Sequence, residues 1–292
     1  MTDTAHKTLA DALGFKPGVT LRTFGMRRSG NHAIINWLQR NSATGSAFLN
    51  NCAVGRPARR TWRSIEINGE RVGIVKGDPL ATVTGGLNDG AMVIVSYEDF
   101  SPDPDEMAGG LTADLEDDAV SYELLIYRNF MNWAASLLRK LQANEDQETL
   151  DCLRIMMVSL AKYRDMLELV LNAKPLGLVP VNYDRWVTRE PYRESLLNAL
   201  GLPCRDNSLG DVQPYGGGSS FQKDVTDAQH LEADNRWPEM ANDAIFQIVL
   251  LAASQDHELL ELMRKLMPRD AELLTNYLEQ AEFPYLVQAG GI

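Results

Sequence analysis

A glycine-bounded loop near the start of the 292-residue chain constrains the fold more than any other feature. The apolar run Val19–Phe24 before the loop has the length and composition of a buried strand. After the loop, Asn31–Gln39 places apolar side chains at the spacing of an amphipathic helix. A strand, a tight loop and a helix in this order are typical of a parallel α/β sheet, and we expect that fold class.

Strand patterns recur along the chain. Apolar runs of strand length lie at Met92–Tyr97, Glu123–Tyr127 and Leu176–Val181. Alternation around Asn68-Gly69 predicts a hairpin whose strands are residues 64–67 and 72–75. Residues 101–118, rich in Asp, Pro and Gly, are expected to form a mobile loop.

Helical patterns alternate with these strands. They cover residues 4–13, 130–143, 148–173, 192–200, 238–253 and 258–267. Short strands alternating with helices predict a three-layer fold with a central parallel sheet flanked by helices on both faces. We expect one domain over residues 1–292, with a core at 19–221 and a helical C-terminal part at 225–292.

Composition limits the cellular setting and the partners. The formal net charge of −12 disfavours binding to nucleic acid by long-range repulsion. The three cysteines are far apart, which argues against a disulfide framework and favours a reducing compartment. The N-terminal residues lack the apolar segment of a signal peptide, and no apolar run is long enough to span a membrane. We therefore expect a cytoplasmic protein.

The loop itself has the G-x-x-x-x-G spacing of a phosphate-binding loop. The residues expected to bind the anion are Arg27, Arg28, Ser29, Gly30, Asn31 and His32. Their backbone N–H groups and the start of the following helix favour an anionic group. Asn31 and His32 replace the Lys and the Mg²⁺-binding Ser or Thr of nucleotide triphosphatases. The sequence therefore predicts a donor handled without Mg²⁺, such as 3′-phosphoadenosine-5′-phosphosulfate (PAPS); the alternative is an ordinary turn with solvated arginines.

A second motif follows the strand that ends at Tyr127. Arg128 stands at the strand end, and Ser136 lies about two helical turns further on. Together with Arg28-Ser29-Gly30-Asn31-His32, these residues resemble the PAPS-dependent sulfotransferase family. The family's two motifs read roughly [K/R]-S-G-T-T and R-N-P-x-D-x-x-x-S. The chain departs from the second motif at Phe130 and Asn132, where the family has Pro and Asp.

The resemblance implies how the donor is bound. It implies a P-loop-like fold with a four- or five-stranded parallel sheet, PAPS as co-substrate and 3′-phosphoadenosine-5′-phosphate (PAP) as product. The first loop would bind the 5′-phosphosulfate, and Arg128 and Ser136 the 3′-phosphate. Residues Gly217, Gly218 and Ser219 lie where the family has a loop that closes over the 3′-phosphate, and a flexible linker is an equal alternative.

The transfer needs a cation and a base. Arg28 is expected to stabilise the charge that develops on the leaving 5′-phosphate. The general base is expected to be Glu98, in a stretch that resembles some bacterial sulfotransferases, or else Asp78. For each carboxylate a solvated strand end is the alternative. The acceptor hydroxyl would belong to a small molecule or a carbohydrate.

Two other functions and one absence complete the expectations. Glu98 and Asp99 after an apolar strand could instead hold Mg²⁺ in a P-loop-type kinase that uses ATP. A non-catalytic nucleotide-binding protein with a degenerate pocket is the second alternative. The histidines outside the loop have no partners at metal-ligand spacing, so no metal site is expected. The oligomeric state is left open.

Overall fold

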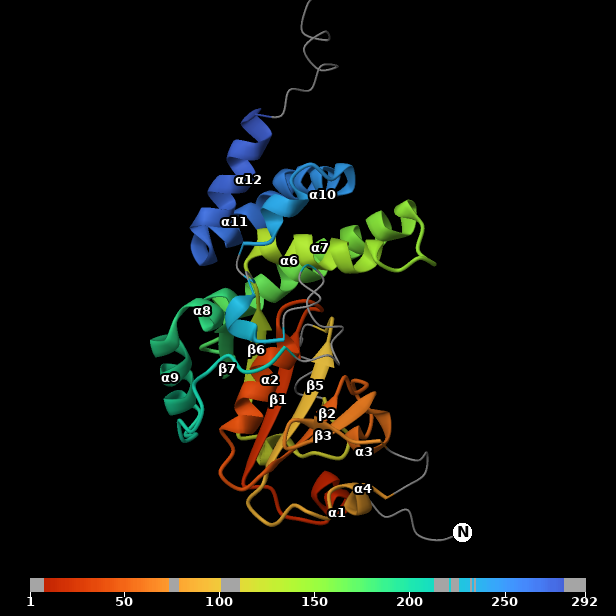
Figure 1. Cartoon of the computed structure of the whole chain (residues 1–292), viewed down its shortest axis with the longest axis vertical. Coiled ribbons are helices and arrows are strands. Elements are labelled where there is room, and N and C mark those ends of the chain that lie inside the picture. The colour runs from red at the N-terminus through yellow and green to blue at the C-terminus, as the bar shows by residue number, and fades with distance from the viewer. Residues whose placement is uncertain are drawn as a thin grey trace, which may run out of the picture. The chain divides into compact units, whose positions relative to one another are not determined.

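Figure 1 shows the computed structural model of the chain, which describes residues 8–73, 79–100, 111–212, 221, 226–231, 233 and 235–280. The chain divides into two compact units. Unit 1 comprises Met1–Arg128 and Asn172–Asp234, and unit 2 comprises Asn129–Leu171 and Asn235–Ile292.

Unit 1 is built on a mixed sheet with the strand order β4-β3-β2-β5-β1-β6-β7. The strands are β1 (Val19–Gly25), β2 (Ser46–Asn50), β3 (Ser64–Ile67), β4 (Glu70–Arg71), β5 (Met92–Glu98), β6 (Tyr122–Tyr127) and β7 (Leu178–Asn182). Strands β2, β5, β1, β6 and β7 are parallel, while β3 and β4 are added antiparallel at one edge. The predicted α/β class with a central parallel sheet is confirmed, and the antiparallel edge is an addition to it.

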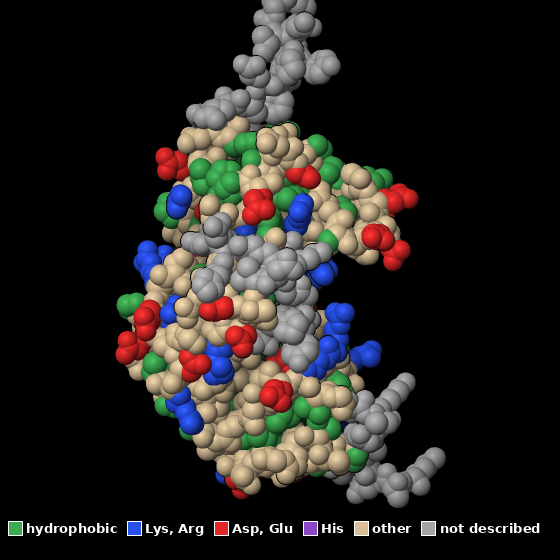
Figure 2. Space-filling model, viewed as in Figure 1, with side chains coloured by type: hydrophobic (Ala, Val, Ile, Leu, Met, Phe, Trp, Pro, Cys, Tyr) green, Lys and Arg blue, Asp and Glu red, His purple; other side chains and the backbone are tan. Residues whose placement is uncertain are grey.

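Helices surround the sheet of unit 1 and make up most of unit 2. In unit 1 they are α1 (Leu9–Leu13), α2 (Asn31–Arg40), α3 (Ala58–Thr61), α4 (Leu80–Val83), α8 (Tyr183–Thr188) and α9 (Glu190–Ala199). In unit 2 they are α6 (Phe130–Gln142), α7 (Thr149–Leu171), α10 (Ala244–Gln255), α11 (His257–Leu266) and α12 (Pro268–Gln280). Charged side chains of both signs are spread over the face drawn in Figure 2.

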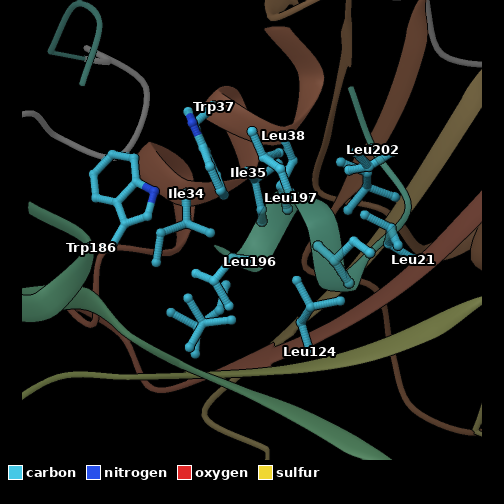
Figure 3. Packing of buried hydrophobic residues seen from close by; sticks show 14 of the residues in the cluster. Leu21, Ile34, Ile35, Trp37, Leu38, Leu124, Trp186, Leu196, Leu197 and Leu202 are labelled. Carbon is cyan, nitrogen blue, oxygen red and sulfur yellow. The ribbon is translucent and has the colours of Figure 1, made fainter. Parts of the chain in front are cut away.

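The core of unit 1 fixes helix α2 against the sheet. Leu38 of α2 and Leu21 of β1 are fully buried in one cluster, to which α9 contributes Leu197 (Figure 3). Trp37 of α2 meets Trp186 of α8 edge to face, with ring centroids 5.8 Å apart. Burying side chains of this size is worth about 1.5–3 kcal/mol each. The start of α2, and with it the loop that follows β1, is therefore held firmly in place.

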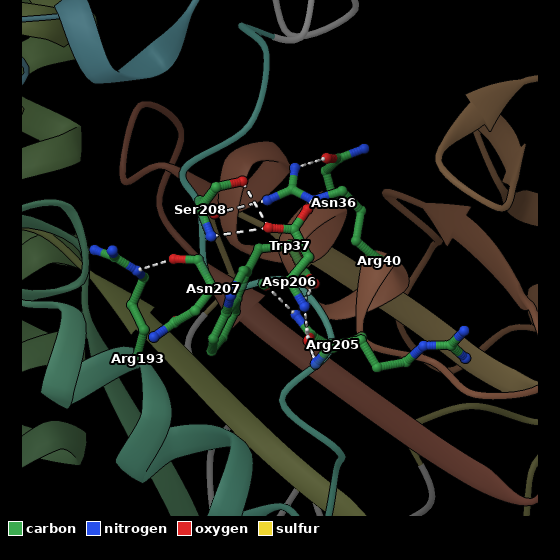
Figure 4. Close-up of polar contacts among 9 residues, drawn as sticks. Asn36, Trp37, Arg40, Arg193, Arg205, Asp206, Asn207 and Ser208 are labelled. Atoms are coloured by element: carbon green, nitrogen blue, oxygen red, sulfur yellow. Dashed lines mark hydrogen bonds and ion pairs between the residues drawn. The ribbon is translucent and has the colours of Figure 1, made fainter.

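A polar network ties the far end of α2 to the segment that follows α9 (Figure 4). The Arg40 guanidinium pairs with the Asp206 carboxylate at 2.8 Å and donates to the Ser208 carbonyl at 2.8 Å. Arg193 of α9 donates to the Asn207 carbonyl at 2.8 Å. The segment has no regular secondary structure, so these side chains satisfy backbone carbonyls that a helix or sheet would otherwise pair.

Most sequence-predicted elements are confirmed with small shifts of their bounds. Strand β2 and helices α3, α4, α8 and α12 were not predicted. Strand β2 is short and buried throughout and so shows no alternation. The second strand of the hairpin begins at Glu70, directly after the Asn68-Gly69 turn, instead of at residue 72. The single helix expected over 238–253 is wrong at its start. Asp243 caps α10 by accepting from two backbone N–H groups, and residues 237–240 form a separate 3₁₀ turn.

Candidate functional site

The topology of unit 1 marks where a ligand can bind. From β1 the chain crosses the sheet to β2, whereas from β5 it crosses in the opposite direction to β6. In an open α/β sheet such a reversal opens a crevice beyond the carboxyl ends of the two strands. Gly25 and Glu98 are paired in register at these two ends. The predicted phosphate loop and the favoured base therefore lie side by side.

The loop after β1 is a tight turn that leads into an uncapped helix. Arg28 and Gly30 both have left-handed backbone, with φ of 69° and 89°. The Ser29 N–H donates to the Met26 carbonyl at 3.1 Å, which closes the turn. Gly30 is the N-cap of α2 and supplies no side-chain cap. The first N–H groups of a helix have no acceptor within it, so this end is suited to an anion.

Gly30 is required by packing as well as by its backbone angle. A Cβ atom at this position would lie 2.0 Å from Cδ2 of Tyr183, the first residue of α8. The absence of a side chain lets α8 approach the loop closely. Tyr183 is thus part of the wall of the site, a role that the sequence reasoning did not assign to it.

Gly30→Ala is expected to destabilise the protein by about 3 kcal/mol, from the clash with Tyr183 and the left-handed backbone together. Gly55→Ala is the matched control, because Gly55 also has positive φ but nothing within 4 Å of its Cβ position. The control should cost only about 1 kcal/mol. Chemical denaturation of both variants measures the difference, and equal losses would contradict the close approach of Tyr183.

Arg128 is buried directly after the end of β6 and supports the loop through a hydrogen bond to its backbone. Its side chain is 2% exposed. It donates through Nη1 to the carbonyl of Arg28 at 3.2 Å and through Nη2 to the carbonyl of Ala233. Its guanidinium lies over the Tyr183 ring, 5.1 Å from the centroid, and its Nε is 3.9 Å from the Asp184 carboxylate. These contacts give a long side chain one defined position.

The two arginines form a cationic site. Burial lowers the pKa of Arg28 below its usual value, and the nearby charge of Arg128 lowers it further. Two guanidinium groups held together in a partly desolvated place repel one another. An anion bound between them and the start of α2 would relieve that repulsion. The arrangement therefore favours a ligand with concentrated negative charge.

Other loop residues have different surroundings. Arg27 is exposed and its guanidinium pairs with Asp99, whose carboxylate also accepts from the Arg27 N–H at 2.8 Å. Ser29 is fully buried, and its hydroxyl has no hydrogen-bond partner among the described residues. Burial lowers the pKa of His32, as do Arg28 and Arg71, so that the neutral imidazole is favoured. Within the loop, burial therefore acts on the Arg28 charge, and the Ser29 hydroxyl is a buried polar group without a described partner.

Glu98 lies beside the loop and is electrostatically coupled to it. Burial raises the pKa of the Glu98 carboxyl, and the adjacent Asp99 raises it further. Asn51 donates to the carboxylate at 3.4 Å. The Asn31 side chain also hydrogen-bonds it, an effect that lowers the pKa. A carboxyl with a raised pKa next to a cationic loop has the properties that a general base needs.

Glu98→Gln is expected to stabilise the protein at neutral pH and to have no effect in acid. A carboxyl whose pKa is raised by folding contributes full stability below its unfolded pKa, and that contribution is lost as pH rises through the folded pKa. The uncharged amide avoids the loss at high pH. Thermal unfolding from pH 4 to 8 measures the effect, with the exposed Glu116→Gln as control. A gain that is largest at pH 4 would contradict the burial of Glu98.

The roles of the remaining predicted site residues are not tested by the structure. Ser136 is buried in α6 of unit 2, and its pairing with the phosphate partner Arg128 stays a prediction. Asn132, at the position where the resembled family has Asp, accepts from the Arg236 N–H at 2.9 Å. Asp78, Gly217, Gly218 and Ser219 lie outside the described residues, and their roles stay predictions as well.

Comparisons with known proteins give a structural likeness but no sequence match. No protein-family model matches the sequence, and no curated protein matches it. A crystal structure of mouse sulfotransferase SULT7A1 complexed with PAP is similar over 94% of this chain and 93% of that chain. The sequence identity is 11% and the TM-score is 0.40. A likeness this low carries no argument, so the site rests on the chain's own geometry.

Two searches of the described residues complete the account of the site. No helix among them is long and apolar enough to cross a membrane. No three His, Cys, Asp or Glu side chains among them are grouped closely enough to hold a metal ion.

The partners that sequence reasoning missed are Tyr183, Asp184 and Asn51. The first two directly follow the carboxyl end of β7, which is the signal that could have found them.

Proposed function

We propose that this chain is a PAPS-dependent sulfotransferase that moves a sulfuryl group to a hydroxyl of a small-molecule or carbohydrate acceptor. The observation that carries the proposal is the pair Arg28 and Arg128 beside the uncapped start of α2, with Glu98 at the neighbouring strand end. The loop carries cationic charge, and His32 stands where a nucleotide triphosphatase has its Mg²⁺-binding Ser or Thr. This combination fits a donor that is used without a metal ion.

In this proposal the two phosphates of the donor are bound by separate groups. The 5′-phosphosulfate lies on the backbone N–H groups at Ser29–His32 and on the Arg28 guanidinium. The 3′-phosphate is bound by Arg128 and Ser136, and residues 217–219 close over it. Support comes from the defined position of the Arg128 guanidinium, which lies over the Tyr183 ring and donates to the loop backbone at Arg28. The single domain expected from the sequence stays a prediction.

The transfer then needs no covalent intermediate on the protein. Glu98, or Asp78, takes the proton of the acceptor hydroxyl as its oxygen attacks the sulfur. The bond between sulfur and the bridging oxygen of the 5′-phosphate breaks, and PAP leaves. Arg28 stabilises the negative charge that develops on that oxygen. The raised pKa of Glu98 supports its assignment as the base.

A P-loop-type kinase is the second candidate. It needs an acidic strand end free to hold Mg²⁺, and Glu98-Asp99 are in the right place. The Asp99 carboxylate is however engaged by both the side chain and the backbone N–H of Arg27. This pairing favours the sulfotransferase over the kinase. A non-catalytic nucleotide-binding protein would keep the cations but has no need of a base at Glu98.

Calorimetry with PAP and with ATP, with and without Mg²⁺, tests the proposal. We expect micromolar PAP binding that is independent of Mg²⁺ and at least about tenfold tighter than ATP binding, because the 3′-phosphate adds a charge-assisted contact. Ser136→Ala should weaken PAP binding by about tenfold. The control is Ser254→Ala, which removes another buried hydroxyl of unit 2. Mg²⁺-dependent ATP binding tighter than PAP binding would replace the proposal by the kinase.

A further inference from the structure

A basic segment adjoins the candidate base on the surface of an acidic protein. Residues 51–73 contain five arginines and two glutamates, a net charge of +3, whereas the whole chain carries −12. The five are Arg56, Arg59, Arg60, Arg63 and Arg71. On the face drawn in Figure 2, Lys and Arg side chains gather where Figure 1 shows α3 and the strands next to it. Such a local concentration of positive charge attracts anionic ligands and repels cationic ones.

Most of these arginines are not used to hold the fold together. Arg59 and Arg71 are the exceptions. Arg59 pairs with the buried Asp114 carboxylate at 3.1 Å and so anchors α3, and Arg71 lies close enough to Glu66 to lower the pKa of that carboxyl. Arg56, Arg60 and Arg63 are exposed. Their guanidinium groups have no hydrogen-bond or ion-pair partner among the described residues. Three cations are therefore available to a ligand.

The segment leads directly to Glu98 through the ends of three strands. The Arg63 N–H donates to the carbonyl of Asn50 at 2.8 Å, at the end of β2. The next residue, Asn51, contacts the Glu98 carboxylate through its side chain at 3.4 Å. The Arg63 charge is close enough to lower the pKa of Glu98. A molecule that places a hydroxyl at Glu98 is therefore also close to the Arg63 charge.

We propose that the acceptor carries an anionic group, a carboxylate or a sulfate, which Arg60 and Arg63 bind while the acceptor hydroxyl lies at Glu98. This inference rests on the proposed sulfotransferase function. A guanidinium matches the geometry of either anion with two parallel hydrogen bonds. On sequence alone, the acidity of residues 101–118 would suit a neutral or cationic acceptor. Asp114, a buried acid of that stretch, is however paired with Arg59.

The test compares acceptors that differ only in charge, with the protein saturated with PAP. The sugar set is methyl β-D-glucuronide, methyl β-D-glucoside and methyl β-D-glucoside 6-sulfate, which separates carboxylate from sulfate. The aromatic pair is 4-hydroxybenzoate and 4-hydroxybenzamide. Calorimetry should show that at least one acid binds about tenfold more tightly than its neutral counterpart. The double variant Arg60→Ala/Arg63→Ala should abolish the preference, and Arg154→Ala, an exposed arginine of unit 2, should keep it.

Each outcome decides one question. Three results would overturn this inference: equal binding of the acid and neutral compounds, no binding of either, or a preference that survives in the double variant. If the protein still binds PAP in these cases, the proposed function stands. Loss of PAP binding in the unchanged protein would instead overturn the proposed function. PAP affinity also serves as the check that Arg60→Ala/Arg63→Ala is folded, since neither residue is placed in the donor site.

Discussion

Arg28→Ala is expected to lower the kcat of sulfuryl transfer by about a hundred- to a thousandfold, the cost of removing one preorganised donor from a developing anion. Stability should not fall with it. Burial and the neighbouring Arg128 already lower the pKa of Arg28, which means that its charge is disfavoured in the folded protein. Removing that charge relieves the repulsion, so the variant should unfold at the same temperature as the wild type or higher.

The adjacent arginine provides the matched control. Arg27 carries the same side chain one residue earlier in the loop, but it is exposed and paired with Asp99. Arg27→Ala should therefore reduce the rate less than about tenfold, in keeping with the small worth of an exposed ion pair. The measurement is PAP release from PAPS with each variant, together with thermal unfolding. Equal losses for the two variants would show that Arg28 has no special place at the leaving group.

Arg128→Ala is expected to reduce both stability and PAP affinity. The buried side chain satisfies the carbonyls of Arg28 and Ala233 and lies near the Asp184 carboxylate, so its removal leaves buried polar groups without their donor. Breaking such a buried pair costs about 3–5 kcal/mol. Loss of the contact to the 3′-phosphate should weaken PAP binding by at least about tenfold.

Arg128→Lys separates these two effects. Lysine keeps the charge and part of the packing but lacks the planar fork, so it should recover some stability and little PAP affinity. Denaturant unfolding gives the first quantity, and calorimetry on the folded fraction gives the second. If Arg128→Lys binds PAP as tightly as the wild type, the guanidinium is structural and the 3′-phosphate is bound elsewhere.

Sequence reasoning predicted the local elements of the site well. The strand Val19–Gly25, the glycine loop and the helix from Asn31 all form as expected, because their patterns depend on nearby residues alone. Glu98 was expected at a strand end, and it lies in register with Gly25. That pairing depends on the strand order, which hydrophobic periodicity does not specify.

What sequence reasoning missed depends on contacts between distant residues. The pairing of Arg27 with Asp99 joins residues 72 positions apart, so the sequence alone could not tell which of the two adjacent arginines is held by that carboxylate. The role of Tyr183 follows from its approach to Gly30, which no local pattern encodes. Strand β2 was missed because a fully buried strand of five residues lacks alternation. The arginines of residues 56–71 became informative only once β3 was placed near the end of β5.

A crystal structure of the protein grown with PAP tests the central claim most directly. The account predicts the 5′-phosphate within hydrogen-bond distance of the backbone N–H groups at Ser29–His32 and of the Arg28 guanidinium, and the 3′-phosphate at Arg128. The path from the 5′-phosphate toward Glu98 should be open to an acceptor. PAP bound away from the loop after β1, or with its 5′-phosphate turned away from Arg28, would contradict the account.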